Sequence, residues 1–284
     1  MVSFQSLAGE GWRRTESVRW LVVVPFVWSF AQFGSVQSVL DYHGFTVGLR
    51  LPVPAALPTL WTFARVPSSG ITVNPPTGAG GVFPPILGVP VAFVVGGLLT
   101  AGFLGELHAA MAAPERRGFV ENVVRFAVPQ LSYAALVALA GVLVGGLASV
   151  FPPAILVAFV GFFVAGYLFW ATPFLVVTDD RSLAEAVQRS YRLAMDGGEH
   201  ASFFFKYLGA GALLSIPVTL FTVNFGFVGL FLGAVVTAPL CLAFSAAALA
   251  YLDGGPVSRE VGGTSDHGPG AGMANSDTDH PRNP

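Results

Sequence analysis

The sequence predicts an all-α fold, a polytopic bundle of six transmembrane helices with short amphipathic helices at the cytoplasmic interface. Three observations favour this class. Of the 284 residues, 54% are hydrophobic and only 11% are charged, whereas soluble domains carry about 25% charged residues. Six apolar runs are long enough to cross a bilayer, and nearly all basic residues lie on one side of the resulting topology. A water-solvated globular domain is therefore not expected.

The six apolar runs cover residues 20–40, 82–104, 126–150, 153–177, 203–223 and 226–251. A hydrocarbon core of about 30 Å needs roughly 20 helical residues. Backbone groups in a bilayer are satisfied only in helices or closed barrels, and these runs lack the alternation of barrel strands. The first run is interpreted as an uncleaved span rather than a signal peptide, because Glu10 and Glu16 lie in a long polar region before it.

The basic residues predict the orientation of the bundle. Twelve of the fourteen fall on one side, namely Arg13, Arg14, Arg19, Arg116, Arg117, Arg125, Arg181, Arg189, Arg192, Lys206, Arg259 and Arg282. Only Arg50 and Arg65, both in the first loop, fall on the other side. Because cytoplasmic loops are enriched in Lys and Arg, both termini are predicted to lie in the cytoplasm of a cell-membrane protein.

Residues 179–198, "DDRSLAEAVQRSYRLAMDGG", predict a capped helix between the fourth and fifth spans. Ser182 and Glu185 form a capping-box pattern, in which each side chain satisfies a backbone amide of the other. The Gly197-Gly198 pair is typical of a helix C-terminus. Asp179 and Asp180, directly before the cap, fit the positive end of the helix dipole better than a catalytic carboxylate pair.

This predicted helix is amphipathic. Leu183, Val187 and Tyr191 recur at helical spacing, whereas Arg189 and Arg192 fall on the polar face. Such a helix is suited to lie in the headgroup region against anionic lipid. These five residues are the candidate contact site for anionic inner-leaflet headgroups or a protein partner.

Similar charged segments precede each pair of spans. Near the N-terminus, Phe4, Leu7, Ala8 and Trp12 share a stripe, and residues 105–126 show apolar spacing on both sides of Pro114. The chain is therefore divided into a membrane domain, 1–252, of three possible units of interfacial helix plus hairpin, covering 1–104, 105–178 and 179–252. Residues 253–284 are rich in Gly, Ser, Asp and Pro and are predicted to form a disordered cytoplasmic tail.

The first loop, residues 41–81, is Pro-rich and is predicted to be external. Its prolines forbid a long helix and favour extended or turn geometry. The stretch "LPTLWTFARV" is apolar enough to dip back into the outer leaflet or pack on the bundle. An ordered external loop is nevertheless the expected structure.

The stretch "TPFLVVTDDRSLAEAVQRSYRLAMDGG" resembles the membrane domain attached to some glycerophosphodiester phosphodiesterases, and related stand-alone archaeal and bacterial membrane proteins. The matching residues are Pro173, Glu185, Ala186, Arg189, Ser190, Tyr191 and Gly197. "TAGFLGELHAAM" resembles the same family's exit from its second span. The phosphodiesterase catalytic domain has no counterpart here, because only a tail follows Tyr251. The resemblance implies a membrane domain and not the enzyme activity.

Sequence motifs for catalysis, nucleotide binding and metal binding are absent from the chain, including His-Glu-x-x-His, Gly-x-Ser-x-Gly and the phosphate-binding loop. Glu106 and His108 are two residues apart and cannot share one face of a helix, so a solvated interfacial pair is expected. The single cysteine, Cys241, is expected to face lipid or a helix. No catalytic or metal site, cofactor or nucleic-acid partner is predicted.

Small residues in the spans predict close helix packing. They form three faces, Gly97/Ala101/Gly105, Gly141/Gly145/Ser149 and Gly229/Gly233. Packing within the monomer is the preferred interpretation, and homodimerisation is the alternative. Gln32, Gln130 and Asn224 either line a cavity or form hydrogen bonds between helices.

Two functions remain open at this stage. The first is a non-catalytic membrane-organising or partner-binding module that uses its cytoplasmic amphipathic helices. The second is a carrier or permease for a lipid-like or neutral small molecule. A sealed bundle favours the first function, whereas a cavity lined by Gln32, Gln130 or Asn224 favours the second.

The predicted topology is testable by cysteine labelling. In a Cys241→Ala background, cysteines at Ser68 and Ser149 are expected to react with an impermeant thiol reagent added outside the cell. A cysteine at Ser190 is expected to stay unlabelled, because the positive-inside rule places it in the cytoplasm. Labelling of the opposite set would contradict the orientation.

Overall fold

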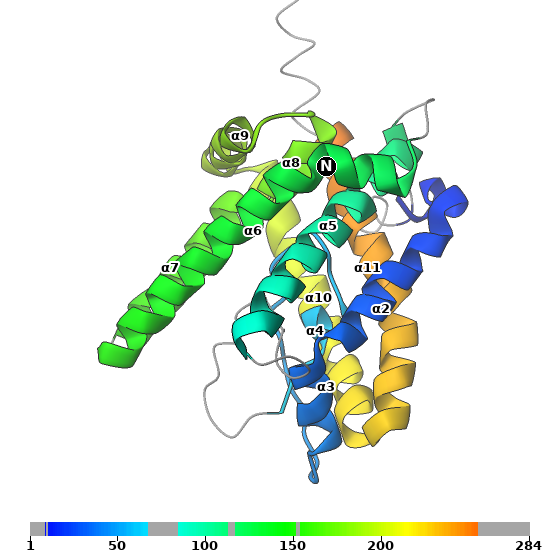
Figure 1. Ribbon diagram of the computed structural model, residues 1–284, viewed down its shortest axis with the longest axis vertical. Coiled ribbons are helices and arrows are strands. Elements are labelled where there is room, and N and C mark those ends of the chain that lie inside the picture. The colour runs from blue at the N-terminus through cyan, green and yellow to red at the C-terminus, as the bar shows by residue number, and fades with distance from the viewer. Residues whose placement is uncertain (1–8, 10, 68–84, 113–116, 152–153, 255–284) are drawn as a thin grey trace, which may run out of the picture.

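The computed structural model describes residues 9, 11–67, 85–112, 117–151 and 154–254. Every regular element in this part of the chain is helical, which confirms the all-α class (Figure 1). The elements are η1 (Glu16–Val22), α2 (Val23–Ala31), α3 (Phe33–Leu40), α4 (Leu60–Phe63), α5 (Pro85–Ala112), α6 (Phe119–Val150), α7 (Ala154–Phe169), α8 (Thr172–Thr178), α9 (Leu183–Asp196), α10 (Glu199–Asn224) and α11 (Gly226–Gly254).

The predicted spans are present, and the first of them is broken. Five helical segments are long and apolar enough to cross a membrane, with α7 and α8 together forming the one that ends at Thr178. The first predicted span consists of η1 and α2 followed by α3, with a bend of 66° between them. The break falls at Gln32, whose φ of −83° and ψ of 63° are not helical. The bundle therefore has six spans if the bent pair counts as one.

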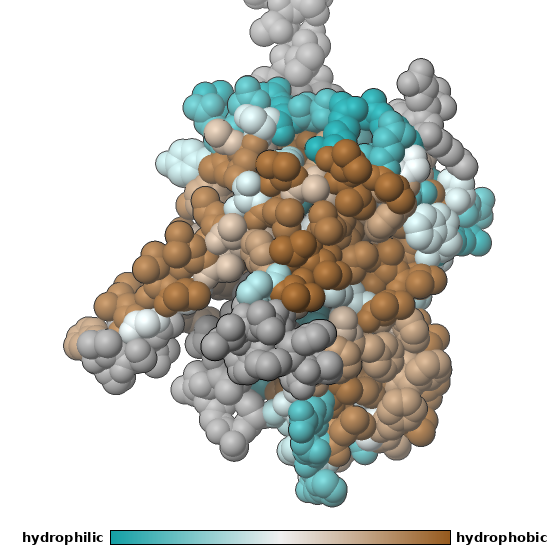
Figure 2. Space-filling view, in the orientation of Figure 1, coloured by the Kyte–Doolittle hydropathy of each residue, from teal (hydrophilic) through white to brown (hydrophobic). Residues whose placement is uncertain are grey.

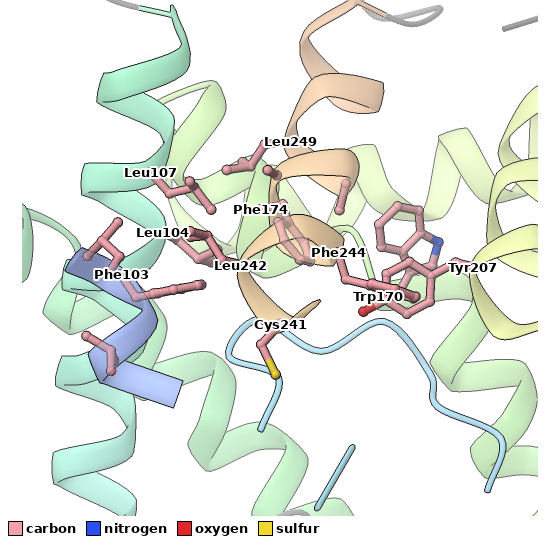
Figure 3. Close-up of a cluster of buried hydrophobic side chains, with 14 of the residues drawn as sticks. Phe103, Leu104, Leu107, Trp170, Phe174, Tyr207, Cys241, Leu242, Phe244 and Leu249 are labelled. Atoms are coloured by element: carbon pink, nitrogen blue, oxygen red, sulfur yellow. The ribbon is translucent and has the colours of Figure 1, made fainter. Parts of the chain in front are cut away.

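Helix α11 lies at the centre of the bundle and α6 at its edge. The α11 span has a mean hydropathy of 2.3 and buries half of its most apolar window, whereas the α6 span buries only 6%. Figure 3 shows Leu242 of α11 close to Leu104 of α5 and Phe174 of α8. Cys241 is fully buried there, so it faces neighbouring elements rather than lipid.

Two of the three small-residue faces bring helices into close contact. A Cβ atom built on Gly97 would lie 2.4 Å from Leu131 of α6, and one on Gly105 would lie 2.6 Å from Asn122. On Gly233 it would lie 2.3 Å from the Thr222 hydroxyl of α10. In contrast, nothing lies within 4 Å of the corresponding position on Gly141, so packing within the monomer does not explain this glycine.

Residues 46–66 do not form the plain ordered loop expected from the sequence, because they pack into the bundle. This re-entrant segment carries α4, and Leu60, Trp61 and Phe63 are almost completely buried. Helix α4 packs on α2, α10 and α11. The alternative in which "LPTLWTFARV" packs on the bundle is therefore correct, while residues 68–81 lie outside the described residues.

Side chains of the spans satisfy the backbone of the re-entrant segment. The amides of Arg50 and Arg65 donate to the hydroxyls of Ser215 and Thr219, each at 2.9 Å. Asn224 accepts from the amide of Thr46 and donates to its carbonyl, each at 2.8 Å. Non-helical backbone at membrane depth is tolerated only where protein or water satisfies its polar groups.

The first span holds the tip of this segment. The Ser29 hydroxyl accepts a hydrogen bond from the amide of Leu60 at 2.9 Å, and the Ser29 carbonyl accepts one from the indole of Trp61 at 2.7 Å. Gln32 at the bend lies 3.4 Å from the Thr59 hydroxyl. The bend in the first span thus coincides with the place where the segment is bound.

Charged side chains gather at one end of the bundle. Figure 2 shows a hydrophilic band over the ends of α5, α6, α8 and α9, above a broad hydrophobic belt. This charged end is defined by residues 105–112, 117–125 and 178–200, together with Asp253. No separate interfacial helix forms in the described part of residues 105–126, because α5 continues to Ala112 and α6 begins at Phe119. Of the predicted N-terminal stripe, only Trp12 is described, and it packs against the core. Phe4, Leu7 and Ala8 and the tail from residue 255 lie outside the described residues.

Replacing Gly211 tests the packing of the re-entrant segment. A Cβ atom at Gly211 would lie 2.1 Å from Pro52, so Gly211→Ala is expected to destabilise the bundle by about 1–3 kcal/mol through overpacking. Gly209→Ala on the same helix is the matched control, because nothing lies within 4 Å of that position. The control is expected to be neutral or slightly stabilising, because alanine favours helix more than glycine. Equal melting temperatures of the two variants in detergent would contradict the position of Pro52.

Candidate contact site at the charged end

Helix α9 begins with the predicted capping box. The Ser182 hydroxyl accepts from the amide of Glu185, and the Glu185 carboxylate accepts from the amide of Ser182. The Ser182 hydroxyl also donates to the Glu185 carboxylate, and this bond, together with the one from the Ser182 amide, lowers the pKa of Glu185 by favouring its charged form. The helix ends at Gly197, whose φ of +63° disfavours other residues.

The face of α9 that packs on the bundle is rotated from the predicted apolar stripe. Ala186, Ser190, Leu193 and Ala194 are buried, whereas Leu183 and Val187 are half-buried and Tyr191 is 44% exposed. The sequence pattern misses Ser190 because a hydroxyl counts as polar. Its neighbours provide the partner that makes burial acceptable, since the Ser190 hydroxyl donates to the Leu168 carbonyl at 2.8 Å.

A second hydrogen bond fixes the C-terminal half of α9. The Tyr167 hydroxyl of α7 donates to the Ala194 carbonyl at 2.8 Å. Together with the Ser190 bond, it attaches α9 to α7 at two points along its length. In Figure 1, α9 is seen nearly end-on above the long axis of α7, so it lies across the end of the bundle.

The prediction that Arg189 faces outward is wrong. Its guanidinium Nε lies 3.2 Å from a carboxylate oxygen of Asp179, and both side chains are only 16% exposed. Arg181 lies 3.1 Å from the same oxygen. Asp179 therefore binds arginines rather than the N-terminal dipole of α9, and Arg189 ties the helix to the preceding turn.

Asp180 joins this turn to α6. Its carboxylate accepts two hydrogen bonds from Arg125, one of them from Nε at 2.8 Å. Asp180 has a φ of +52°, a conformation tolerated by Asp more than by most residues. The Arg125 hydrogen bond is the main cause of the lowered pKa of Asp180. A lowered carboxylate pKa means that this pair contributes to stability at neutral pH and that the contribution is lost below about pH 4.

One side of α9 remains exposed. We define the outer strip of α9 as Gln188, Tyr191, Arg192 and Met195, which follow the i, i+3, i+4, i+7 spacing of one helical face. Met195 is 64% exposed. Of the predicted contact residues, Tyr191 and Arg192 belong to this strip, whereas Leu183, Val187 and Arg189 do not.

Polar residues within the spans form hydrogen bonds with other parts of the chain. Gln130 donates to the Pro173 carbonyl at 2.8 Å, and Asn224 and Gln32 bind the re-entrant segment. His200 is buried, and its Nε2 atom lies 3.0 Å from the indole nitrogen of Trp170. The alternative in which Gln32, Gln130 and Asn224 form interhelical hydrogen bonds is therefore the correct one for these contacts.

The histidine at the end of α5 has a partner that spacing did not predict. His108 Nδ1 lies 3.5 Å from a carboxylate oxygen of Asp253 at the end of α11. The sequence predicts a solvated His108 and gives no sign of Asp253 as its partner, because only the folded bundle brings these two helix ends together.

Comparison with protein-family models, curated proteins and solved structures finds no match to this chain.

Two arginines of α9 provide a matched test of this geometry. Arg189→Gln is expected to weaken the attachment of α9 by about 1–2 kcal/mol, because it leaves the largely buried Asp179 with one cation fewer. Arg192→Gln is expected to change stability by less than about 0.5 kcal/mol, as exposed charges usually do. Hydrogen exchange of the α9 amides measures both effects. Equal protection in the two variants would contradict the role of Arg189.

Proposed function

We propose that the protein is a non-catalytic integral membrane protein of the cell membrane that acts by binding at its charged end. In this proposal both termini and the charged end face the cytoplasm, in accordance with the distribution of arginines. The outer strip of α9 is the contact surface, and its ligand is the anionic lipid of the inner leaflet.

This proposal is supported mainly by the outer strip of α9, which combines apolar side chains with a cation. The helix that carries the strip is fixed to the bundle by hydrogen bonds and an ion pair. Tyr191 and Met195 supply apolar surface, whereas Arg192 supplies a cation beside it. This combination suits the boundary between acyl chains and headgroups, where each basic residue near an anionic surface contributes about 1 kcal/mol. The buried face of α9 binds the bundle, so the outer strip is available for an external contact.

The hydrogen bonds of the span residues support binding over transport. Transport through the bundle would require a path between the helices, and Asn224 and Ser29 instead hold the re-entrant segment there. Tyr207 and Phe244 pack edge to face in the same region, with ring centroids 4.8 Å apart. A carrier would have to break these contacts in every cycle.

A spin label at Gln188 tests the proposed contact. In vesicles that contain phosphatidylglycerol, the label is expected to be more accessible to oxygen than to a water-soluble nickel relaxant. Arg192→Glu is expected to move the label toward water, because the substitution reverses the charge that faces the anionic lipid. Arg192→Glu in vesicles of phosphatidylcholine alone is the control and is expected to have a smaller effect.

A label in bulk water in the unmodified protein would contradict lipid contact and would indicate a protein partner or no ligand for α9.

Gln188 also replaces Ser190 as the informative inner position for cysteine labelling. Ser190 is fully buried, so a cysteine there would remain unlabelled in either orientation. A cysteine at Gln188 is exposed and reports the side of the membrane directly.

A further inference from the structure

A second feature of the charged end lies away from the outer strip of α9. A cavity of about 350 Å³ opens between the ends of α5, α6 and α8 and the turn that follows α8. Small-molecule sites occupy roughly 300–1,000 Å³, so this cavity has the size of a small ligand or a headgroup. Its lining includes His108, Ala109, Arg117, Arg125, Phe126 and Asp180.

The polar part of the lining is rich in donors. The lining carries the charged groups of two arginines and one aspartate, and Glu121 beside the lining is ion-paired with Arg117. Asp180 engages Nε and one terminal nitrogen of Arg125, so the other terminal nitrogen is not part of this pair. Arg117 forms a long, exposed ion pair with Glu121, with 3.9 Å between the nitrogen and the oxygen, and such a pair is weak enough for a phosphate to compete with it.

Asn122 and the start of α6 adjoin the arginine side of the cavity. Asn122 donates to the carbonyls of Arg117 and Gly118, and it thereby holds the chain just before α6 in place. Helix α6 begins there without a side-chain cap, and the first amides of a helix carry partial positive charge. His108 of α5 also lines the cavity; its side chain is partly exposed, and its Nδ1 lies 3.5 Å from Asp253.

Apart from Thr178, the rest of the lining is apolar. Ala109, Phe126 and Val177 line the cavity, and all three are buried. The cavity therefore combines guanidinium groups with an apolar wall at the level where the spans leave the hydrophobic belt. Guanidinium groups match phosphate oxygens in geometry and charge, and the apolar wall suits the carbons next to a phosphate ester.

We propose that this cavity is a binding site for a phosphate ester, with Arg117 as its main ligand-binding side chain and Arg125, held by Asp180, as the second. The proposal does not rest on the lipid contact of α9, because the two surfaces share no residue. A glycerophospholipid headgroup and a soluble phosphate ester offer the same chemistry to the cavity, and the experiment below separates these two sources.

Calorimetric titration of the purified, delipidated protein tests the proposal. The probes are dihexanoyl phosphatidylglycerol, glycerol phosphate and phosphate-free dihexanoylglycerol. Binding of at least one phosphate-bearing probe is expected, together with no binding of dihexanoylglycerol. Tighter binding of the lipid identifies a headgroup site, whereas equal binding of glycerol phosphate identifies a site for a soluble ester. Failure of both phosphate probes, or equal binding of dihexanoylglycerol, would overturn the proposal.

Variants assign the binding to this cavity. Arg117→Gln is expected to weaken binding about tenfold, because it removes one charge-assisted contact to the phosphate. Ala109→Leu is expected to weaken it without a change in charge, by filling the space. Lys206→Gln lies outside both the cavity and the outer strip of α9, and it is expected to stay within about twofold of the unmodified protein. Unchanged affinity of Arg117→Gln would overturn the assignment even if Ala109→Leu fails to fold.

Discussion

The non-helical backbone of residues 46–66 needs hydrogen-bond partners inside the bundle. The surrounding helices provide these partners through polar side chains. Unsatisfied amides and carbonyls at membrane depth cost several kcal/mol each, so a non-helical segment can enter only where protein provides partners. Ser29, Ser215, Thr219 and Asn224 provide them. The small Gly211 leaves room for Pro52, which explains why a glycine lies at this point of an otherwise apolar helix.

Polar groups at the charged end are also satisfied by partners from other elements. There the partners form ion pairs between side chains rather than hydrogen bonds to the backbone. Asp179 and Asp180 are adjacent in the chain but bind different elements, α9 through Arg189 and α6 through Arg125. The turn between α8 and α9 therefore connects two helices that are distant in sequence. The outer strip of α9 and the cavity beside α6 are consequently held in a fixed relation to each other, which is what the two proposed phosphate contacts require.

Local patterns predict much of this structure, and tertiary contacts account for most of what they miss. The spans follow from hydropathy, and the α9 cap follows from Ser182 and Glu185, because both depend on residues close in sequence. The packing of residues 46–66 into the bundle cannot be predicted in this way, because an apolar Pro-rich stretch is equally compatible with an exposed loop and with a buried segment. The helical spacing predicts an exposed Arg189, because its partner Asp179 precedes the helix and is not part of the repeat from which the faces of α9 are predicted. Helix α9 is therefore predicted where it forms, but of the five predicted contact residues only Tyr191 and Arg192 lie on its exposed strip.

The central claim is that residues 46–66 lie inside the bundle, and a cross-link tests it most directly. A Cβ atom on Gly166 of α7 would lie 3.3 Å from the Val53 side chain. Cysteines at Val53 and Gly166 in a Cys241→Ala background are therefore predicted to form a disulfide rapidly under mild oxidation in native membranes, whereas the pair Val53 and Gly161 is predicted not to do so. Absence of the Val53–Gly166 cross-link, together with ready labelling of the Val53 cysteine by an impermeant reagent, would show that this segment lies outside the bundle.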